Sequence, residues 1–164
     1  MKKVVLCIMI VAITVLVSCG NNDYNTPDES AREMITNIVI CFESKDKETL
    51  KSYFSEQMQD RSTLDSEINI AFEFLDGEIV SVGEPNSGCI GPIDDKAFGG
   101  HIKNVTTSNG TVYKFDFKGM YRYDKDTSQE GVTGLRIINM SDDYDYDNPN
   151  GDISVHRCIV GEYD

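Results

Sequence analysis

Apolar side chains recur at helical spacing from residue 26 onward. Thr26, Pro27 and Glu29 form a typical helix start, because threonine can cap, proline is tolerated in the first turn and glutamate completes a capping box. One apolar face then extends to about residue 44, made by Ala31, Met34, Ile35, Ile38, Val39 and Phe42. The same spacing predicts a second helix over 46–54 and a third over 62–75, which the left-handed Gly77 should end.

After residue 77 the pattern changes from helical to alternating. It predicts strands over 78–82, 101–107, 111–124, 132–140 and 153–160, and a loop rich in glycine and proline over 87–100. Asn109-Gly110 is a strong signal for a hairpin between the second and third of these strands.

The strand over 111–124 has the clearest alternation in the chain. Its inward positions are aromatic: Tyr113, Phe115, Phe117, Tyr121 and Tyr123. Its other positions are polar: Lys114, Asp116, Lys118 and Arg122. This pattern indicates a sheet with one packed face and one wet face, so we expect Asp116 in solvent. Gly119 interrupts the aromatic row and predicts a bend or bulge.

Helices followed by a meander of antiparallel strands define an α+β class. We expect two or three N-terminal helices on one face of a curved antiparallel sheet. The 164 residues allow one such domain, which the pattern places over 27–164.

The first 18 residues are typical of a secretory signal. Lys2 and Lys3 precede an apolar run from Val4 to Val17, which is short for a stable membrane span. The run ends in Leu16-Val17-Ser18-Cys19, which resembles the lipobox of bacterial lipoproteins. The resemblance implies cleavage before Cys19, lipid on its thiol, a polar tether over 19–26 and a position on the extracytoplasmic face of the cell membrane. The alternatives are a retained helix and an ordinary signal peptide.

The charge of the chain restricts its partners. There are 28 acidic against 15 basic residues, a formal net charge of −13, and cleavage after residue 18 would remove two of the lysines. Nucleic acids are therefore excluded as partners, because binding them depends on many lysine and arginine contacts to phosphate. An anionic membrane surface gains nothing from such a chain, so the lipid on Cys19 is the expected attachment.

Cysteine usage predicts neither a disulfide framework nor a zinc site. Cys41, Cys89 and Cys158 remain beyond the signal and Cys19, an odd number without a Cys-x-x-Cys motif. Cys41 lies in an apolar helical run and is expected to be a small buried hydrophobe. Cys89 and Cys158 either pair outside the cytoplasm or stay free. No cofactor is implied.

Three segments carry a resemblance to known families. The run from Cys41 to Phe54 looks like the helix-to-helix start of nuclear-transport-factor-2-like (cystatin-like cone) domains. Residues 71–81 and 134–138 are similar to uncharacterised lipoproteins of clostridial-type Gram-positive bacteria. The resemblance implies a pocket between helices and sheet, lined here by Tyr113, Phe115, Phe117, Tyr121 and His101. It also implies relatives that are isomerases, dehydratases or cyclases with a His/Asp or Tyr/Asp pair in that pocket.

The residues themselves contain few catalytic signals. His101 and His156 are candidate general bases, or else surface or hydrogen-bonded histidines. The tyrosines either line a pocket or are half-buried packing. The sequence has no Gly-x-Ser-x-Gly, His-Glu-x-x-His or phosphate-loop motif.

An acidic stretch over 142–152 has the alternating carboxylates with which EF-hand loops begin. Its candidate calcium ligands are Asp143, Asp145, Asp147 and Asp152. The sixth position counted from Asp143 is Asn148 where an EF-hand has glycine, and the twelfth is Ser154 where it has glutamate. A solvated loop with turn-forming residues is the simpler interpretation.

Together these observations predict a lipid-anchored extracytoplasmic module without catalytic activity. It would hold a small ligand or dock another envelope protein. The alternatives are a pocket enzyme of the isomerase, dehydratase or cyclase type, and a calcium-stabilised structural module.

Overall fold

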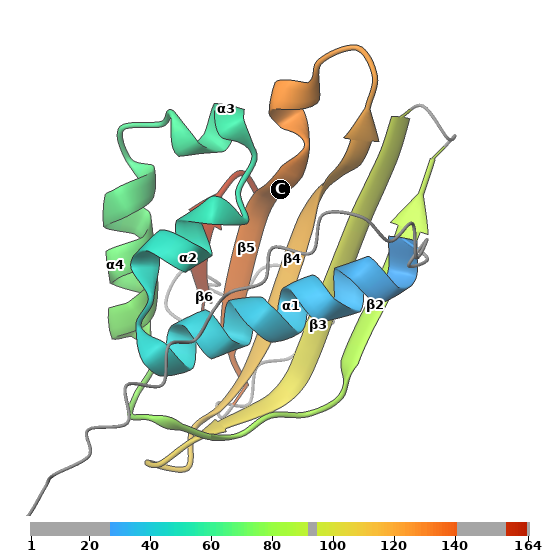
Figure 1. The fold of residues 1–164 in the computed structure, drawn as a ribbon. Coiled ribbons are helices and arrows are strands. Elements are labelled where there is room, and N and C mark those ends of the chain that lie inside the picture. The colour runs from blue at the N-terminus through green and yellow to red at the C-terminus, as the bar shows by residue number, and fades with distance from the viewer. Residues whose placement is uncertain (1–26, 92–94, 141–156, 164) are drawn as a thin grey trace, which may run out of the picture.

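The computed structural model describes residues 27–91, 95–140 and 157–163 of the chain. In these residues, helices come first and pack against one face of a curved, unclosed antiparallel sheet of six strands (Figure 1). The predicted α+β class is therefore confirmed. The helices are α1 (Pro27–Ser44), α2 (Lys47–Ser52), α3 (Glu56–Gln59) and α4 (Leu64–Phe74).

Helices α1, α2 and α4 correspond to the three predicted helices. Asp46 caps α2, its carboxylate accepting a hydrogen bond from the Thr49 backbone N–H at 3.0 Å. Helix α3 was not predicted, because four residues are too few to show a helical period; Ser55 caps it through the Met58 N–H. Gly77 has the expected left-handed conformation, with φ +98°, but α4 already ends at Phe74 and Leu75 is extended.

The sheet has the order β1-β3-β4-β5-β6, and β2 pairs with β3 as well. Since β1 and β2 both pair with β3, they share one edge of the sheet, while β6 forms the opposite edge. The strands are β1 (Ile79–Ser81), β2 (Pro85–Ile90), β3 (Asp95–Thr107), β4 (Val112–Tyr123), β5 (Gly131–Asn139) and β6 (Arg157–Gly161).

The predicted loop over 87–100 is wrong, because much of it forms β2 and the start of β3. These strands pair directly, with Gly88 opposite Gly99 and Cys89 opposite Phe98. Glycine lowers intrinsic strand propensity, so this stretch looks like a loop in the sequence. The neighbouring strand β4 supplies the cross-strand hydrogen bonds that hold it in the sheet.

The Asn109-Gly110 hairpin between β3 and β4 is confirmed. Gly110 has φ +85°, and the Thr107 N–H donates to the Thr111 carbonyl at 2.9 Å. The irregularity at Gly119 is also confirmed, because the register of β4 against β5 shifts between Lys118 and Gly119. Beyond this shift the inward alternation is lost, and Tyr121, expected to point inward, is 42% exposed.

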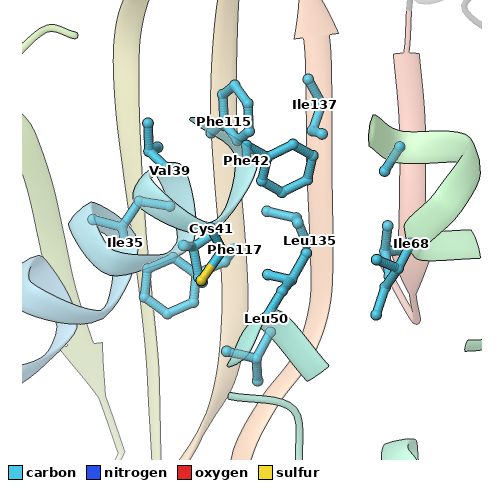
Figure 2. Packing of buried hydrophobic residues seen from close by; sticks show 14 of the residues in the cluster. Ile35, Val39, Cys41, Phe42, Leu50, Ile68, Phe115, Phe117, Leu135 and Ile137 are labelled. Atoms are coloured by element: carbon cyan, nitrogen blue, oxygen red, sulfur yellow. The ribbon is translucent and has the colours of Figure 1, made fainter. Parts of the chain in front are cut away.

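The core lies between the helices and the sheet. Helix α1 crosses β2, β3 and β4, and α4 packs beside β6 (Figure 1). Ile35, Val39 and Phe42 of α1 face the sheet residues Phe115 and Phe117 (Figure 2). The Phe42 ring makes edge-to-face contacts with Phe115 and Phe72, at centroid distances of 5.1 and 4.9 Å. The space in which a cone-type pocket was expected is therefore filled by side chains.

Cys89 and Cys158 do not pair. Both are free thiols, and they lie on β2 and β6, with β3, β4 and β5 between them. At about 4.8 Å per strand the two are about 19 Å apart, whereas a disulfide needs Cα atoms within about 7 Å. Cys41 is buried, as expected.

We expect alkylation to distinguish these thiols. Burial raises the pKa of Cys158 to about 11 and also raises the pKa values of Cys41 and Cys89. Iodoacetamide at pH 8 should modify the half-buried Cys89 first, and Cys41 and Cys158 only in denaturant, because the thiolate is the reactive form. Peptide mass mapping measures this, and equal native labelling of Cys89 and Cys158 would contradict the packing of β6.

In the described ranges no helix is both long and apolar enough to cross a membrane.

Candidate functional site

Four polar side chains lie in one row across the face of the sheet turned away from the helices, here called the outer face. Asn86 of β2 is opposite His101 of β3, His101 is opposite Asp116 of β4, and Asp116 is opposite Arg136 of β5. Directly opposite residues in paired strands share a face, so these four side chains are neighbours. We call them the polar row.

Asp116 is the centre of the polar row and is only 4% exposed, so its expected place in solvent is wrong. One carboxylate oxygen accepts from Lys114 Nζ at 2.6 Å, and the other from Arg136 Nη2 at 2.8 Å. The prediction failed because β4 is a central strand. Long basic side chains on β4 and β5 close over a short carboxylate between them, on the face opposite to the one that α1 and α4 cover.

His101 is half-buried beside Asp116. Burial and then the charge of Lys114 lower the pKa of His101, while the charge of Asp116 acts in the opposite direction. The imidazole is therefore neutral at pH 7, with one nitrogen that donates and one that accepts a hydrogen bond.

A second row, next to the polar row, consists mainly of glycine. Gly88 is opposite Gly99, Gly99 is opposite Lys118, and Lys118 is opposite Gly134. The missing side chains leave a hollow of about 330 Å³ over β2 and β3. We call it the outer hollow, and it is lined by Asn86, Ser87, Gly88, Gly99, Gly100, His101, Asp116, Phe117 and Tyr163. An adjoining hollow of about 420 Å³ includes Lys118.

Tyr163 forms a wall of both hollows. A Cβ at Gly134 would collide with the Glu162 carbonyl and come within 3.2 Å of the Tyr163 ring, so the chain after β6 can lie on the sheet only because residue 134 is glycine. The Tyr163 ring centroid is 4.5 Å from Arg136 Cζ and 5.5 Å from Lys118 Nζ. These cation–π contacts hold an aromatic ring at the edge of the glycine row.

The five predicted pocket residues do not line one pocket. His101 lines the outer hollow, where Phe117 contributes its backbone, whereas the side chains of Phe117, Phe115 and Tyr113 are buried on the helix side of the sheet. The Tyr113 hydroxyl accepts from the Asp76 N–H at 2.9 Å and donates to the Phe74 carbonyl at 3.2 Å, so it anchors the end of α4. The tyrosines were expected either to line a pocket or to be packing residues, and Tyr113 is a packing residue.

Sequence reasoning missed Asp116, Arg136, Tyr163 and the glycine floor as parts of one site. The alternation Lys114, Asp116, Lys118 was visible, but the strand register that adds Arg136 to it was not. The glycines of 87–100 indicated a loop, although Gly88, Gly99 and Gly100 form the floor of the outer hollow.

Several predicted residues lie outside the described residues. They are Cys19 with the signal and tether, His156, and the candidate calcium ligands Asp143, Asp145, Asp147 and Asp152. Over residues 27–91, 95–140 and 157–163, no group of three or more acidic, histidine or cysteine side chains is placed to hold a metal ion.

We expect His101 to make stability depend on pH. Its pKa is lower in the folded chain than in the unfolded chain, so the unfolded state binds more protons as the pH falls. The contribution of neutral His101 to the free energy of unfolding is complete above the unfolded pKa of about 6.5. It is lost as the pH falls through the lower folded pKa. Urea unfolding of the wild type and His101→Asn between pH 8 and pH 5 tests this. The difference in unfolding free energy should shift in favour of the variant at low pH, and a constant difference would contradict it.

Comparison with known proteins gives a family without an assigned activity. No curated protein matches the chain. A family model described as "Domain of unknown function (DUF5104)" matches residues 37–140, which run from the middle of α1 to the end of β5 and include His101, Asp116 and Arg136. Because this match spans more than half of the sequence, the chain belongs to the DUF5104 family.

Proposed function

We propose that this chain is a lipid-anchored protein of the bacterial envelope that binds a small planar anion on the outer face of its sheet. The observation that carries the proposal is the outer hollow, which has a floor of bare backbone, an aromatic wall and cations beside it. The binding role is non-catalytic.

Charge favours an anion at this place. Asp116 lines the outer hollow, and its carboxylate oxygens are bonded to Lys114 and Arg136. Lys118 lines the adjoining hollow. The formal net charge of the whole chain is −13, so this local excess of basic groups runs against the composition. A local positive potential raises the concentration and association rate of anions.

Shape favours a flat ligand. Gly88, Gly99 and Gly100 contribute only backbone to the floor, and the Tyr163 ring stands at its side. A ring could lie on the sheet backbone while Asn86 and His101 supply hydrogen bonds at its edge. Pockets of about 300–1,000 Å³ with a few convergent polar groups are typical for small ligands.

Gly88→Val tests the proposal without disturbing the core. A Cβ at residue 88 would meet no other atom within 4 Å, and valine favours strands, so the variant should fold while its side chain enters the outer hollow. Benzoate serves as the probe, and amide chemical shifts of the full chain are recorded by NMR. Benzoate should shift the amides of Gly88, Gly99 and His101 in the wild type, and these shifts should be lost in Gly88→Val.

Two controls complete this experiment. Ser81→Val places the same side chain at an exposed position of strand β1, away from the outer hollow, and should bind benzoate like the wild type. Benzamide, which is flat but uncharged, should bind more weakly than benzoate. Equal binding of the two probes, or equal binding by Gly88→Val and the wild type, would refute the proposed anion site.

The register of His101 opposite Asp116 favours a second candidate function, an acid–base enzyme in which neutral His101 accepts a proton. The family resemblance implies such a His/Asp pair in a pocket between helices and sheet, whereas this pair lies on the outer face. Incubation with a bacterial metabolite extract tests it. A compound consumed by the wild type and not by His101→Asn would establish an enzyme.

The lipid anchor is supported by the sequence Leu16-Val17-Ser18-Cys19. We infer cleavage before Cys19 and attachment through its lipid, as in clostridial-type lipoproteins. We also infer that the family has the cystatin-like cone layout, which the packing of α1 across a curved sheet supports. Cys19→Ala should leave the protein without lipid and release it from membranes. Stable attachment of this kind depends on acyl chains, which the variant cannot carry. Membrane partition that persists in Cys19→Ala would therefore refute the anchor.

A further inference from the structure

A second cleft opens on the opposite side of the sheet, where the C-terminal ends of α1 and α4 meet β1. Its volume is about 470 Å³. We call it the helix-end cleft, and its lining has apolar side chains and a polar rim: Phe42, Phe72, Leu75 and Ile79, and Glu43, Ser44, Lys45, Gly77 and Glu78. It shares no residue with the outer hollow.

The cleft exists because the chain turns sharply after both helices. Lys45 follows α1 with φ +53°, and Gly77 follows α4 with φ +98°, so both segments leave in left-handed turns. The backbone of Glu78 is then fixed by the β3–β4 turn, since its N–H donates to Ser108 Oγ at 3.2 Å and its carbonyl accepts from the Ser108 N–H at 2.7 Å. The rim is therefore held in place by the fold.

The floor of the cleft is aromatic and packed against the core. Phe42 and Phe72 are in edge-to-face contact with a centroid distance of 4.9 Å, and Phe42 packs on Phe115 of the core. Aromatic rings fixed in this way offer an apolar surface that needs no rearrangement to accept a ligand.

The electrostatics of the cleft favour a cation. The carbonyl ends of α1 and α4 both lie here, and each carries the negative end of a helix dipole. Among the described residues, the rim has two carboxylates, Glu43 and Glu78, and one basic side chain, Lys45. The outer hollow, by contrast, has basic side chains near it, so the outer hollow and the helix-end cleft favour ligands of opposite charge.

We propose that the helix-end cleft binds a small amphipathic amine, with its apolar body on Phe42 and Phe72 and its ammonium group toward Glu43 and Glu78. The aromatic floor favours a ligand with an apolar body. The acidic rim and the helix carbonyl ends favour a positive charge on that ligand. This site is independent of the anion site proposed for the outer hollow.

Phenethylamine is the probe, and NMR titration of the full chain is the measurement. Dissociation constants of about 1–10 mM are expected for a ligand of this size. The amides of residues 42–45 and 77–79 should shift. Phenylacetate has a similar shape and the opposite charge, and we expect it to bind at least tenfold more weakly. Equal affinity for the two probes, or shifts confined to other residues, would overturn the proposal.

The double substitution Glu43→Gln/Glu78→Gln removes the rim charge and should weaken phenethylamine binding by about fivefold or more. The matched control, Glu56→Gln/Glu84→Gln, makes the same change in net charge at two exposed residues outside the cleft and should leave affinity unchanged. Thermal unfolding establishes that both variants fold. Equal weakening by the two double variants would show a general charge effect and overturn the site.

Discussion

Phe115→Ala is expected to lower the free energy of unfolding by about 3–5 kcal/mol, the largest effect of any single change considered for this domain. Phe115 is fully buried at the centre of β4, and its ring packs edge-to-face against Phe42 of α1 (Figure 2). Removing the ring forfeits its burial and leaves a cavity that neighbouring side chains fill only in part.

The position of Phe115 makes this result informative. The resemblance to cone domains predicts that Phe115 lines a ligand pocket, where truncation would enlarge a cavity at little cost in stability. The structure instead makes it a contact between helix and sheet. Urea unfolding measures the difference, and Val80→Ala, at a side chain that is 64% exposed, should show no measurable loss. A loss for Phe115→Ala as small as that for Val80→Ala would mean that Phe115 borders an open pocket, as the resemblance implies.

Asp116→Asn is expected to destabilise the domain by about 3 kcal/mol, because it leaves two cations facing each other without the carboxylate between them. The side chains of Lys114 and Arg136 are 14% and 28% exposed, so water screens them only in part. This value is at the low end for a broken buried ion pair because Arg136 retains contact with water.

A double-mutant cycle separates the ion pair from its surroundings. Combining Asp116→Asn with Arg136→Gln should cost less than the sum of the two single changes, because each removes the same interaction. Asp65→Asn removes a carboxylate from the exposed pair with Lys51 and should have no measurable effect on stability. Additive losses at Asp116 and Arg136 would mean that the pair contributes nothing beyond its separate contacts.

The binding-site substitutions are expected to leave the fold unchanged, unlike Phe115→Ala and Asp116→Asn. Gly88→Val is expected to retain the fold and lose binding, whereas Phe115→Ala weakens the fold itself. The difference follows from place: the Gly88 side of β2 is open on the outer face, and Phe115 lies between the two layers. Stability and ligand binding can therefore be measured separately in this domain.

The local sequence pattern was sufficient to predict structure where a residue's neighbours in sequence determine its environment. The helical spacing of Ile35, Ile38, Val39 and Phe42 predicts α1 and its buried face, and Asn109-Gly110 predicts the β3–β4 turn. Both depend on contacts within a few residues of chain or on one apolar face. The α+β class follows from the change of period after residue 77.

The outer hollow and the polar row were decided by tertiary structure. His101, Asp116 and Arg136 are 15 and 20 residues apart, and only the antiparallel register of β3, β4 and β5 makes them neighbours. A shift of one residue would move each side chain to the other face, so no local pattern predicts such a row. The order of the chain thus determines helices, turns and the packed face, while the pairing of distant strands determines which polar groups meet and where glycine leaves a hollow.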